Sequence, residues 1–410
     1  MIRFLLCLLM LFSGAVARAD GGDSIHYLRK ADAAFTARQI RVARVELMNA
    51  TDADPHNVLA WLYRAKVALA LGRGVEADNA LNDAIRAGAR ESATYHYRAH
   101  ALLLEGKPDA ALQMADASRI PWPWRAYGAR MRGRALAQLG NAHAAMTEFD
   151  AALAMTPRNP GLWEDIAQAK LMFGDRSGAI VAARRAVQLD PKRVSALVLN
   201  GMLVRAQYGL VAALPWFDKA LAIDPINIDG LAERAATLGE LGRYSEMLAT
   251  TRKLLANDPG NPRAYYLQAV LAARAHRFKL AGAIIDLTDG ALDDQPGMML
   301  LKGIVALADN VPQLAQDELG KLVALQPDNA RARRLLALAQ WRGGDADAVV
   351  ETLAPLNDPY ALMLSARALE ALGNRDAAAD YLDRAAFYLP PPGRGDGGLD
   401  DQREAAASGD

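Results

Sequence analysis

The chain has 410 residues, enough for two or three ordinary domains or for one long repeat array. Hydrophobic residues make up 52% of it but aromatic ones only 6%, so alanine and leucine supply most of the apolar surface, which favours helices. Lysine plus arginine and aspartate plus glutamate both number 47, which excludes a globally basic protein, and we expect no nucleic-acid partner.

The N-terminal residues have the pattern of an export signal. Arg3 supplies a positive charge, an apolar run covers Phe4–Phe12, and Ala17–Ala19 has the small-x-small form of a cleavage site. The run is shorter than the roughly 20 residues of a membrane span, although an uncleaved anchor stays an alternative. The only cysteine, Cys7, lies in this run, so a cleaved chain would have no thiol chemistry. We expect residues 1–19 to be a signal peptide. The rest should then be periplasmic, in contact with a membrane only through an uncleaved signal or a partner.

Two markers recur with the same period in the chain that follows. Prolines end the motifs ALAMTP, AVQLDP and ALAIDP at Pro157, Pro191 and Pro225, each 34 residues after the last. Glycines keep the same spacing elsewhere: Gly72, Gly106, Gly140 and Gly174, then Gly242. Two independent markers at one spacing indicate an internal repeat, and periods of about 20–50 residues are typical of solenoids and related arrays.

The repeat resembles the tetratricopeptide repeat, a 34-residue pair of antiparallel helices. That family has a large residue at position 4 of its unit, small ones at 8, 20 and 27, an apolar one at 24 and proline at 32. In the unit that starts at residue 160, positions 4, 8, 20, 24, 27 and 32 are Trp163, Ala167, Ala179, Ala183, Ala186 and Pro191. Small residues let the two helices approach closely, a glycine near position 15 ends the first helix, and the proline stops the second.

Units of this kind start at residues 24, 58, 92, 126, 160, 194, 228, 262, 296, 330 and 359, the tenth being shortened. The resemblance therefore implies an all-α fold, a right-handed α-solenoid of about eleven helix–turn–helix units over residues 24–390. Position 15 departs from glycine at Arg38, His276 and Asn310, and residues 286–296 replace a plain helix end; we interpret both as loop variation. The tail 391–410 is rich in proline, glycine and charge without a period, so we expect it to be disordered.

Motifs that carry catalysis are missing from the sequence. It has no phosphate-binding glycine loop, no G-x-S-x-G elbow and no H-E-x-x-H, so we expect no catalytic residue, no cofactor and no enzyme activity. His96 and His100 have the i, i+4 spacing of a helical metal site, but no third ligand accompanies them on that helix before Glu105. We expect surface or groove histidines and no metal, with a metal site as the alternative.

In the tetratricopeptide family, positions 2, 5, 9, 12 and 13 of the first helix line a concave ligand groove. Carried over to this chain, they give the candidate groove residues Lys66, His96, His100, Tyr127, Arg130, Arg134, Arg331, Arg334, Trp341 and Arg342. Over all units these positions hold ten Lys or Arg against five acidic residues. The excess predicts an acidic ligand, because guanidinium groups pair well with carboxylates; a solvated polar face is the alternative. The terminal-carboxylate clamp of the family's chaperone adaptors is missing, since Arg134 stands where asparagine is needed.

A narrower resemblance lies in the stretch ARARRLLALAQ and the shortened repeat ending in LAPL that follows it. It is similar to large tetratricopeptide-repeat proteins that accompany exosortase (PEP-CTERM) and exopolysaccharide systems in Gram-negative envelopes. This implies a non-enzymatic scaffold that binds other proteins or peptides through its groove and supports exopolysaccharide synthesis, export or protein sorting, with outer-membrane association as one possibility. Direct binding of an acidic exopolysaccharide in the basic groove is the alternative. A third hypothesis is an enzyme built on a frame of helical repeats.

The segment SRIPWPWRAYG, from Ser118 to Gly128, has no counterpart elsewhere in the chain. Pro123 occupies the proline position of the third unit and Pro121 comes two residues early, so the second helix of that unit should end ahead of time. Trp122 and Trp124 should then cover apolar surface at the joint. Recognition of a sugar or peptide by these aromatic rings is the alternative.

Overall fold

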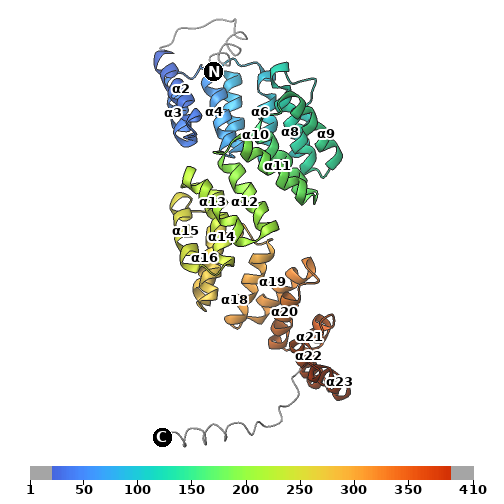
Figure 1. The fold of residues 1–410 in the computed structure, drawn as a ribbon. Coiled ribbons are helices and arrows are strands. Elements are labelled where there is room, and N and C mark those ends of the chain that lie inside the picture. The colour runs from blue at the N-terminus through green and yellow to red at the C-terminus, as the bar shows by residue number, and fades with distance from the viewer. Residues whose placement is uncertain (1–20, 389–410) are drawn as a thin grey trace, which may run out of the picture. The chain divides into compact units, whose positions relative to one another are not determined.

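The computed structural model describes residues 21–388, and the expected signal peptide and disordered tail lie outside the described residues (Figure 1). Within this range the chain forms 22 α-helices and two short 3-10 helices, and no strand. None of the described helices has the length and apolarity to cross a membrane. The chain divides into two compact units, Met1–Ile223 and Asp224–Asp410.

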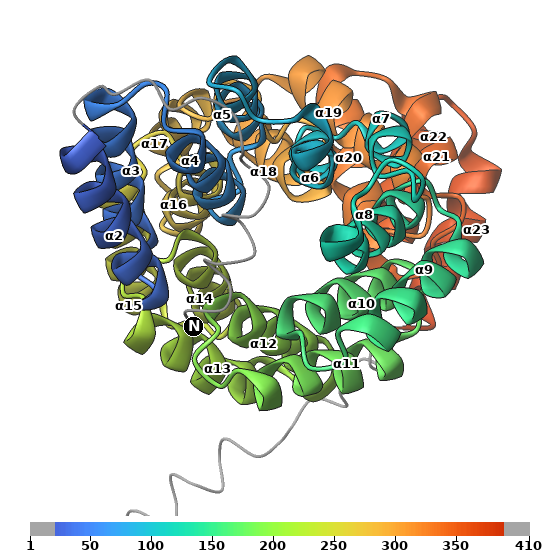
Figure 2. The ribbon, with the colours of Figure 1, turned by 90° about the horizontal axis from the view of Figure 1, so that it is seen from above.

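The first unit consists of helix pairs in which each helix packs on the next. Its helices are α2 (Gly21–Thr36), α3 (Ile40–Ala53), α4 (Val58–Ala70), α5 (Gly74–Arg86), α6 (Tyr95–Leu104), α7 (Pro108–Met114), α8 (Arg125–Gln138), α9 (Ala142–Met155), α10 (Pro160–Met172), α11 (Arg176–Leu189), α12 (Val194–Tyr208) and α13 (Leu210–Ile223), with the 3-10 helices η1 (Glu91–Ala93) and η2 (Trp122–Trp124). Figure 2 shows α6, α8, α10 and α12 on the inner side of a curve and α7, α9, α11 and α13 on its outer side. The first helices of the pairs therefore form the inner face of this unit.

The second unit repeats the same arrangement. Its helices are α14 (Ile228–Glu240), α15 (Tyr244–Asn257), α16 (Pro262–Arg274), α17 (Phe278–Asp286), α18 (Pro296–Ala308), α19 (Pro312–Leu325), α20 (Ala330–Gly343), α21 (Ala346–Leu353), α22 (Pro359–Ala371) and α23 (Arg375–Ala386). Contacts run from each helix to the next and between the first helices of neighbouring pairs, such as α18 and α20. Each unit is thus an α-solenoid, and the expectation of an all-α solenoid is confirmed.

Polar residues after the periodic prolines start the first helices. The side chain of an asparagine accepts a hydrogen bond from a backbone N–H of the first turn at five such helices, through Asn57, Asn159, Asn227, Asn261 and Asn329. A cap of this kind contributes about 1 kcal/mol, since the first N–H groups of a helix have no partner within it. In these repeats the proline thus follows the end of one helix pair, and the asparagine two residues later caps the first helix of the next pair.

The turn inside most helix pairs needs one residue in the left-handed conformation. Glycine supplies it in seven repeats, with φ between 72° and 84°, at Gly72, Gly106, Gly140, Gly174, Gly242, Gly344 and Gly373. Arg38, His276 and Asn310 stand in the same place with φ of 64°, 56° and 57°. The residue varies at these three places while the left-handed turn itself is kept. Residues 286–296 do differ, since α17 ends at Asp286 and turns fill the space before α18.

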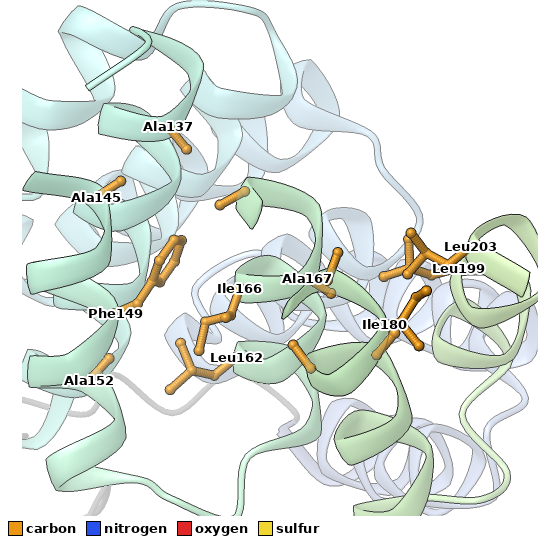
Figure 3. Packing of buried hydrophobic residues seen from close by; sticks show 14 of the residues in the cluster. Ala137, Ala145, Phe149, Ala152, Leu162, Ile166, Ala167, Ile180, Leu199 and Leu203 are labelled. Atoms are coloured by element: carbon orange, nitrogen blue, oxygen red, sulfur yellow. The ribbon is translucent and has the colours of Figure 1, made fainter. Parts of the chain in front are cut away.

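Glycine at position 8 makes room for a large side chain at position 24. A β-carbon on Gly133 would lie 2.7 Å from two ring atoms of Phe149, and one on Gly201 would lie 2.6 Å from the ring of Phe217. Figure 3 shows Phe149 on α9 in one buried cluster with Leu162 and Ile166 of α10. In the repeat that has Ala183 at position 24, position 8 is Ala167. Complementary sizes thus keep the helices of each pair closely packed.

One contact joins parts of the first unit that are far apart in the sequence. Nη2 of Arg38, in the turn between α2 and α3, donates to both carboxylate oxygens of Asp190 at 2.7 and 2.6 Å. Nη1 of the same arginine donates to the carbonyl oxygen of Lys192 at 3.1 Å. Asp190 caps the end of α11, so this contact connects the first helix pair with the fifth.

Candidate functional site

The candidate groove residues fall into two groups, one in each unit. Lys66 lies on α4, His96 and His100 on α6, and Tyr127, Arg130 and Arg134 on α8. Arg331, Arg334, Trp341 and Arg342 all lie on α20. The first group therefore spans three neighbouring inner helices, and the second occupies a single helix.

Lys66 is held by aromatic rings. Its Nζ lies 4.7 Å from the ring centroids of both Phe35 and Tyr63. Burial lowers the pKa of Lys66, and the nearby charge of Asp32 opposes this change. The hydroxyl of Tyr63 donates to Asp32 at 2.5 Å. The cation–π contacts and the Asp32 carboxylate therefore offset only part of the cost of burying the Lys66 ammonium, and its pKa stays below the usual value.

His96 is a core residue. It is fully buried, and neither ring nitrogen has a hydrogen-bond partner among the described residues. Its ring stacks on Trp124 with centroids 4.2 Å apart and planes 12° apart, and it also contacts the ring of Tyr97. Burial lowers the pKa of His96 to about 3, so the ring is neutral at neutral pH. The expectation of a surface or groove histidine is wrong at this position.

His100 is bonded to Tyr127. Its Nδ1 and the Tyr127 hydroxyl share a hydrogen bond of 2.6 Å. Burial, and then the charges of Arg134 and Arg130, lower the pKa of His100 to about 3, and burial raises the pKa of Tyr127 to about 12. Both side chains are therefore neutral polar groups at neutral pH. Within residues 21–388 no three His, Cys, Asp or Glu side chains lie close enough together to hold a metal ion.

Arg130 and Arg134 share one buried carboxylate. Nε of Arg130 donates to Asp165 at 2.5 Å, and Nε of Arg134 lies 3.9 Å from the other oxygen of Asp165. The Asp165 side chain is only 7% exposed. Burial alone would raise its pKa, but the two arginines outweigh burial and hold the pKa below its usual range. These two arginines are thus partly neutralised within the protein.

A second ion pair lies beside the first. Nε of Arg193 donates to Glu164 at 2.8 Å, and the hydroxyl of Ser195 donates to the other oxygen of Glu164 at 2.7 Å. Glu164 and Asp165 are neighbours on α10 and both are nearly buried. The inner face between α8 and α12 therefore carries a continuous network of arginines and carboxylates.

The family model for the tetratricopeptide repeat matches this chain in three segments, residues 28–93, 130–194 and 300–354. These three segments of the chain therefore match tetratricopeptide repeats. Human tetratricopeptide repeat protein 7B is 27% identical over 84 residues, which are 20% of this chain and 10% of that protein. The match therefore spans about a tenth of the relative's length.

Solved structures of other repeat proteins are similar at low identity. A tetratricopeptide repeat protein from Parabacteroides merdae is 18% identical, with 56% of this chain and 92% of that chain covered and a TM-score of 0.39. Yeast Tom70 is 14% identical, with 94% of both chains covered and a TM-score of 0.41. Human IFIT1, solved as a dimer with m7Gppp-AAAA, is 16% identical, with 81% and 90% covered and a TM-score of 0.45.

The tetratricopeptide period explains why sequence reasoning missed Asp165. Arg130 is at position 5 of its repeat and Asp165 at position 6 of the next, so 35 residues separate them. Position 6 is not among the family's usual groove positions, so the groove residues carried over from the family do not include Asp165. The available signal was an opposite charge about one repeat away, which neighbouring inner helices bring together.

The second unit has a hollow between two of its first helices. The hollow is lined by Ile304, Leu307 and Ala308 of α18 and by Leu335, Leu338 and Arg342 of α20. Nη1 of Arg342 donates to the carbonyl oxygen of Leu307 at 2.6 Å, and Nη2 of Arg334 pairs with Asp358 at 3.0 Å. Trp341 packs against the core between α20 and α22, and Arg331 is exposed.

The tryptophan joint agrees only in part with what its sequence predicts. Helix α7 ends early, as expected, but at Met114, well before Pro121, so the proline does not itself stop the helix. Trp124 covers buried surface by stacking on His96. Trp122 is 79% exposed, and the expectation that it covers the joint is wrong.

Proposed function

We propose that this tetratricopeptide-repeat protein is a non-enzymatic scaffold that binds a protein or peptide partner on the inner face of its repeats. The observation that carries the proposal is the hollow between α18 and α20. Ile304, Leu335 and Leu338 are only partly buried there, beside the exposed Arg342. Apolar side chains gathered in a concave place, with a few polar groups at the edge, are typical of recognition sites.

The ionisable groups of the inner face support binding over catalysis. Arg130 and Arg193 are held by Asp165 and Glu164, and the pKa of Asp165 lies below its usual range. A general acid or base at neutral pH needs a pKa near 7, which this pairing does not produce for Asp165. Charges arranged in this way orient side chains for a ligand.

We extend the proposal to the bacterial envelope. The export-signal pattern of residues 1–19 supports a periplasmic location, with outer-membrane association through a partner. The sequence resemblance to proteins of exosortase and exopolysaccharide systems supports a role in polysaccharide synthesis, export or protein sorting. Direct binding of an acidic exopolysaccharide has less support, because Arg130 and Arg134 share Asp165 and the ring of Trp124 is stacked on His96.

The test is co-purification of partners from cross-linked envelopes with wild type, Ile304→Glu and Val181→Glu. Ile304 lines the hollow, whereas Val181 is 67% exposed on α11, an outer helix of the first unit. We expect wild type and Val181→Glu to recover the same polysaccharide or sorting proteins and Ile304→Glu to lose them. Recovery unchanged in Ile304→Glu would refute binding in the hollow. A chain found only in the cytoplasmic fraction would refute the envelope location.

A further inference from the structure

The tryptophan joint, residues 116–125, replaces two polar turn residues of the repeat. Trp122 is at position 31 of its repeat, where four other repeats have aspartate: Asp54, Asp190, Asp224 and Asp258. Arg125 is at position 34, where five other repeats have the asparagine that caps the next helix. Helix α8 begins without a side-chain cap. The third repeat thus forgoes a stabilising cap and gains an indole and a guanidinium group.

Trp122 projects outward from this joint. Ile120 on one side of it is buried and Trp124 on the other side stacks on His96, whereas Trp122 itself is 79% exposed. The side chain of Trp122 makes no hydrogen bond or ring contact with any group in residues 21–388. A proline precedes it and another follows it, and proline rings restrict the backbone. The joint therefore presents an unused indole from a restrained backbone, so little conformational freedom is lost when a partner buries the ring.

Two exposed arginines, Arg119 and Arg125, flank the indole. The guanidinium carbon of Arg119 lies 4.4 Å from the ring centroid of Tyr95, so a cation–π contact holds this side chain. Arg125 is the first residue of α8, and its side chain has no hydrogen bond, ion pair or ring contact in the described part of the chain. A cation at this end of a helix is unfavourable for the helix dipole, so Arg125 does not serve the stability of α8.

The carboxylates nearby do not cancel this positive charge. Asp116, the only carboxylate of the joint, accepts from the backbone N–H of Ser118 at 2.8 Å and from its hydroxyl. The turn before α6 adds one exposed cation and one exposed carboxylate, Arg90 and Glu91, which balance each other. With two arginines against Asp116, the joint keeps a net positive charge, although the whole chain is neutral.

An exposed indole between arginines suits the surface of an anionic bilayer. Tryptophan prefers the boundary between headgroups and acyl chains, and anionic headgroups attract arginine beside it. A protein interface is a poorer match, because its core gathers several apolar side chains. The exposed residues on either side of Trp122 in the chain are mostly polar: Ser118, Arg119, Pro123 and Arg125.

We propose that the tryptophan joint is a membrane contact, in which Trp122 enters the headgroup region of a bilayer and Arg119 and Arg125 bind anionic phospholipids. This contact goes beyond the proposed scaffold function, because the chain itself makes it and no partner is needed. It also leaves the hollow between α18 and α20 free, since the joint belongs to the first unit.

The experiment measures flotation of the full chain with vesicles of phosphatidylcholine alone and of phosphatidylcholine mixed with phosphatidylglycerol. Wild type should prefer the mixed vesicles, and added salt should weaken this preference. Trp122→Ser should lower the partition coefficient at least about fivefold on both kinds of vesicle, because it removes apolar surface. Arg125→Gln should lower it about fivefold on the mixed vesicles only. Residues 1–19 contain an apolar run of their own, so the comparison is between variants that all retain it.

Matched controls come from the outer helices of the same unit. Val211 is 72% exposed on α13 and Arg185 is exposed on α11. Val211→Ser and Arg185→Gln should bind vesicles like wild type, and circular dichroism melts check that all four variants fold.

A second measurement reports whether the indole reaches the bilayer. Lipids brominated near the headgroup end of an acyl chain quench the fluorescence of a tryptophan that they contact. The chain has six tryptophans, and none lies in residues 1–19. Mixed vesicles that carry such lipids should quench wild type, and most of this quenching should be lost in Trp122→Phe.

Equal vesicle binding by wild type and folded Trp122→Ser, or quenching that Trp122→Phe retains, would overturn the membrane contact. Loss of cross-linked envelope proteins in Trp122→Ser with vesicle binding unchanged would also overturn it, and would assign Trp122 to a protein interface.

The variant Ile304→Glu separates this inference from the proposed function. It lies in the second unit, so we expect it to bind vesicles like wild type while it loses envelope partners. Vesicle binding that depends on Trp122, with partner recovery unaffected by Ile304→Glu, would support the membrane contact and overturn the hollow. Loss of partners in Ile304→Glu without any effect of Trp122→Ser on vesicles would leave the scaffold in place and overturn the membrane contact.

Discussion

The pairing of glycine at position 8 with phenylalanine at position 24 predicts the outcome of a conservative substitution. In Gly133→Ala the new β-carbon would lie 2.7 Å from Cδ1 and Cε1 of the fully buried Phe149, closer than such atoms approach each other. The ring must move, and overpacking of this kind costs about 1–3 kcal/mol. Replacing a helical glycine by alanine contributes about 0.5–1 kcal/mol in the other direction. We expect a net loss of up to about 2.5 kcal/mol.

Two further variants isolate the cause. Gly133→Ala combined with Phe149→Leu recreates the pairs Ala31 with Leu47 and Ala65 with Leu81, which are fully buried in the first two repeats. We expect the double variant to lose less stability than the sum of the losses of the two single variants, with a difference of at least about 1 kcal/mol. Gly320→Ala, which meets no atom within 4 Å, should gain about 0.5–1 kcal/mol.

The assay is urea unfolding followed by circular dichroism, with the slope of the transition compared between variants. If the slope is unchanged, a shift in the urea concentration at the midpoint reports a change in the free energy of unfolding. If Gly133→Ala gains stability as Gly320→Ala does, or if the two changes are additive, the size match between positions 8 and 24 does not constrain the packing and the reasoning is refuted.

Three other predictions follow from the ion pairs, the histidines and the turns. Asp165→Asn should lower the free energy of unfolding of the first unit by about 3–5 kcal/mol, because it leaves Arg130 without its buried counter-charge; a loss below about 1 kcal/mol in urea unfolding would contradict this. His96 and His100 have pKa values of about 3 in the folded protein, against 6.5 in the unfolded chain. The unfolded chain therefore binds protons first, and the stability present above pH 6.5 is lost as the pH falls toward 3. For the two histidines together, the loss is up to about 2.7 kcal/mol per pH unit. In His96→Phe that slope, measured by unfolding between pH 7 and 5, should be about halved, and an unchanged slope would count against a buried neutral histidine. His276→Gly should gain about 0.5–1 kcal/mol by relieving the left-handed conformation, and a lower thermal midpoint would show that the side chain is needed there.

Much of the fold follows from the period alone. Helices begin at Val58, Pro160, Val194, Ile228 and Pro262, at the residues where the 34-residue spacing starts its units. Small residues at positions 8 and 20 predict which surfaces meet, because only they allow two helices to approach closely. The sequence does not predict the left-handed turn at Arg38. Glycine usually occupies such a turn, and the sequence does not show that the contact with Asp190 accompanies a strained backbone at an arginine.

The candidate site could be predicted only in part. The period places Arg130 and Arg134 on the inner face, and the structure has them there. It does not predict that Asp165 lies between them, because that contact depends on the offset of two neighbouring helices. His96 and His100 share one helix, yet only His96 is fully buried, since Trp124 reaches it from a 3-10 turn that the repeat pattern does not describe.

The bond between Arg38 and Asp190 changes how the first unit would respond to force. In a solenoid each repeat contacts only its neighbours, so tension on one end is transmitted pair by pair, and terminal repeats detach first. With Arg38 bonded to the end of α11, the first five helix pairs form a closed mechanical loop. A pull on α2 is then shared at once by the fifth pair, and the loop opens at a single ion pair whose strength falls as salt is added.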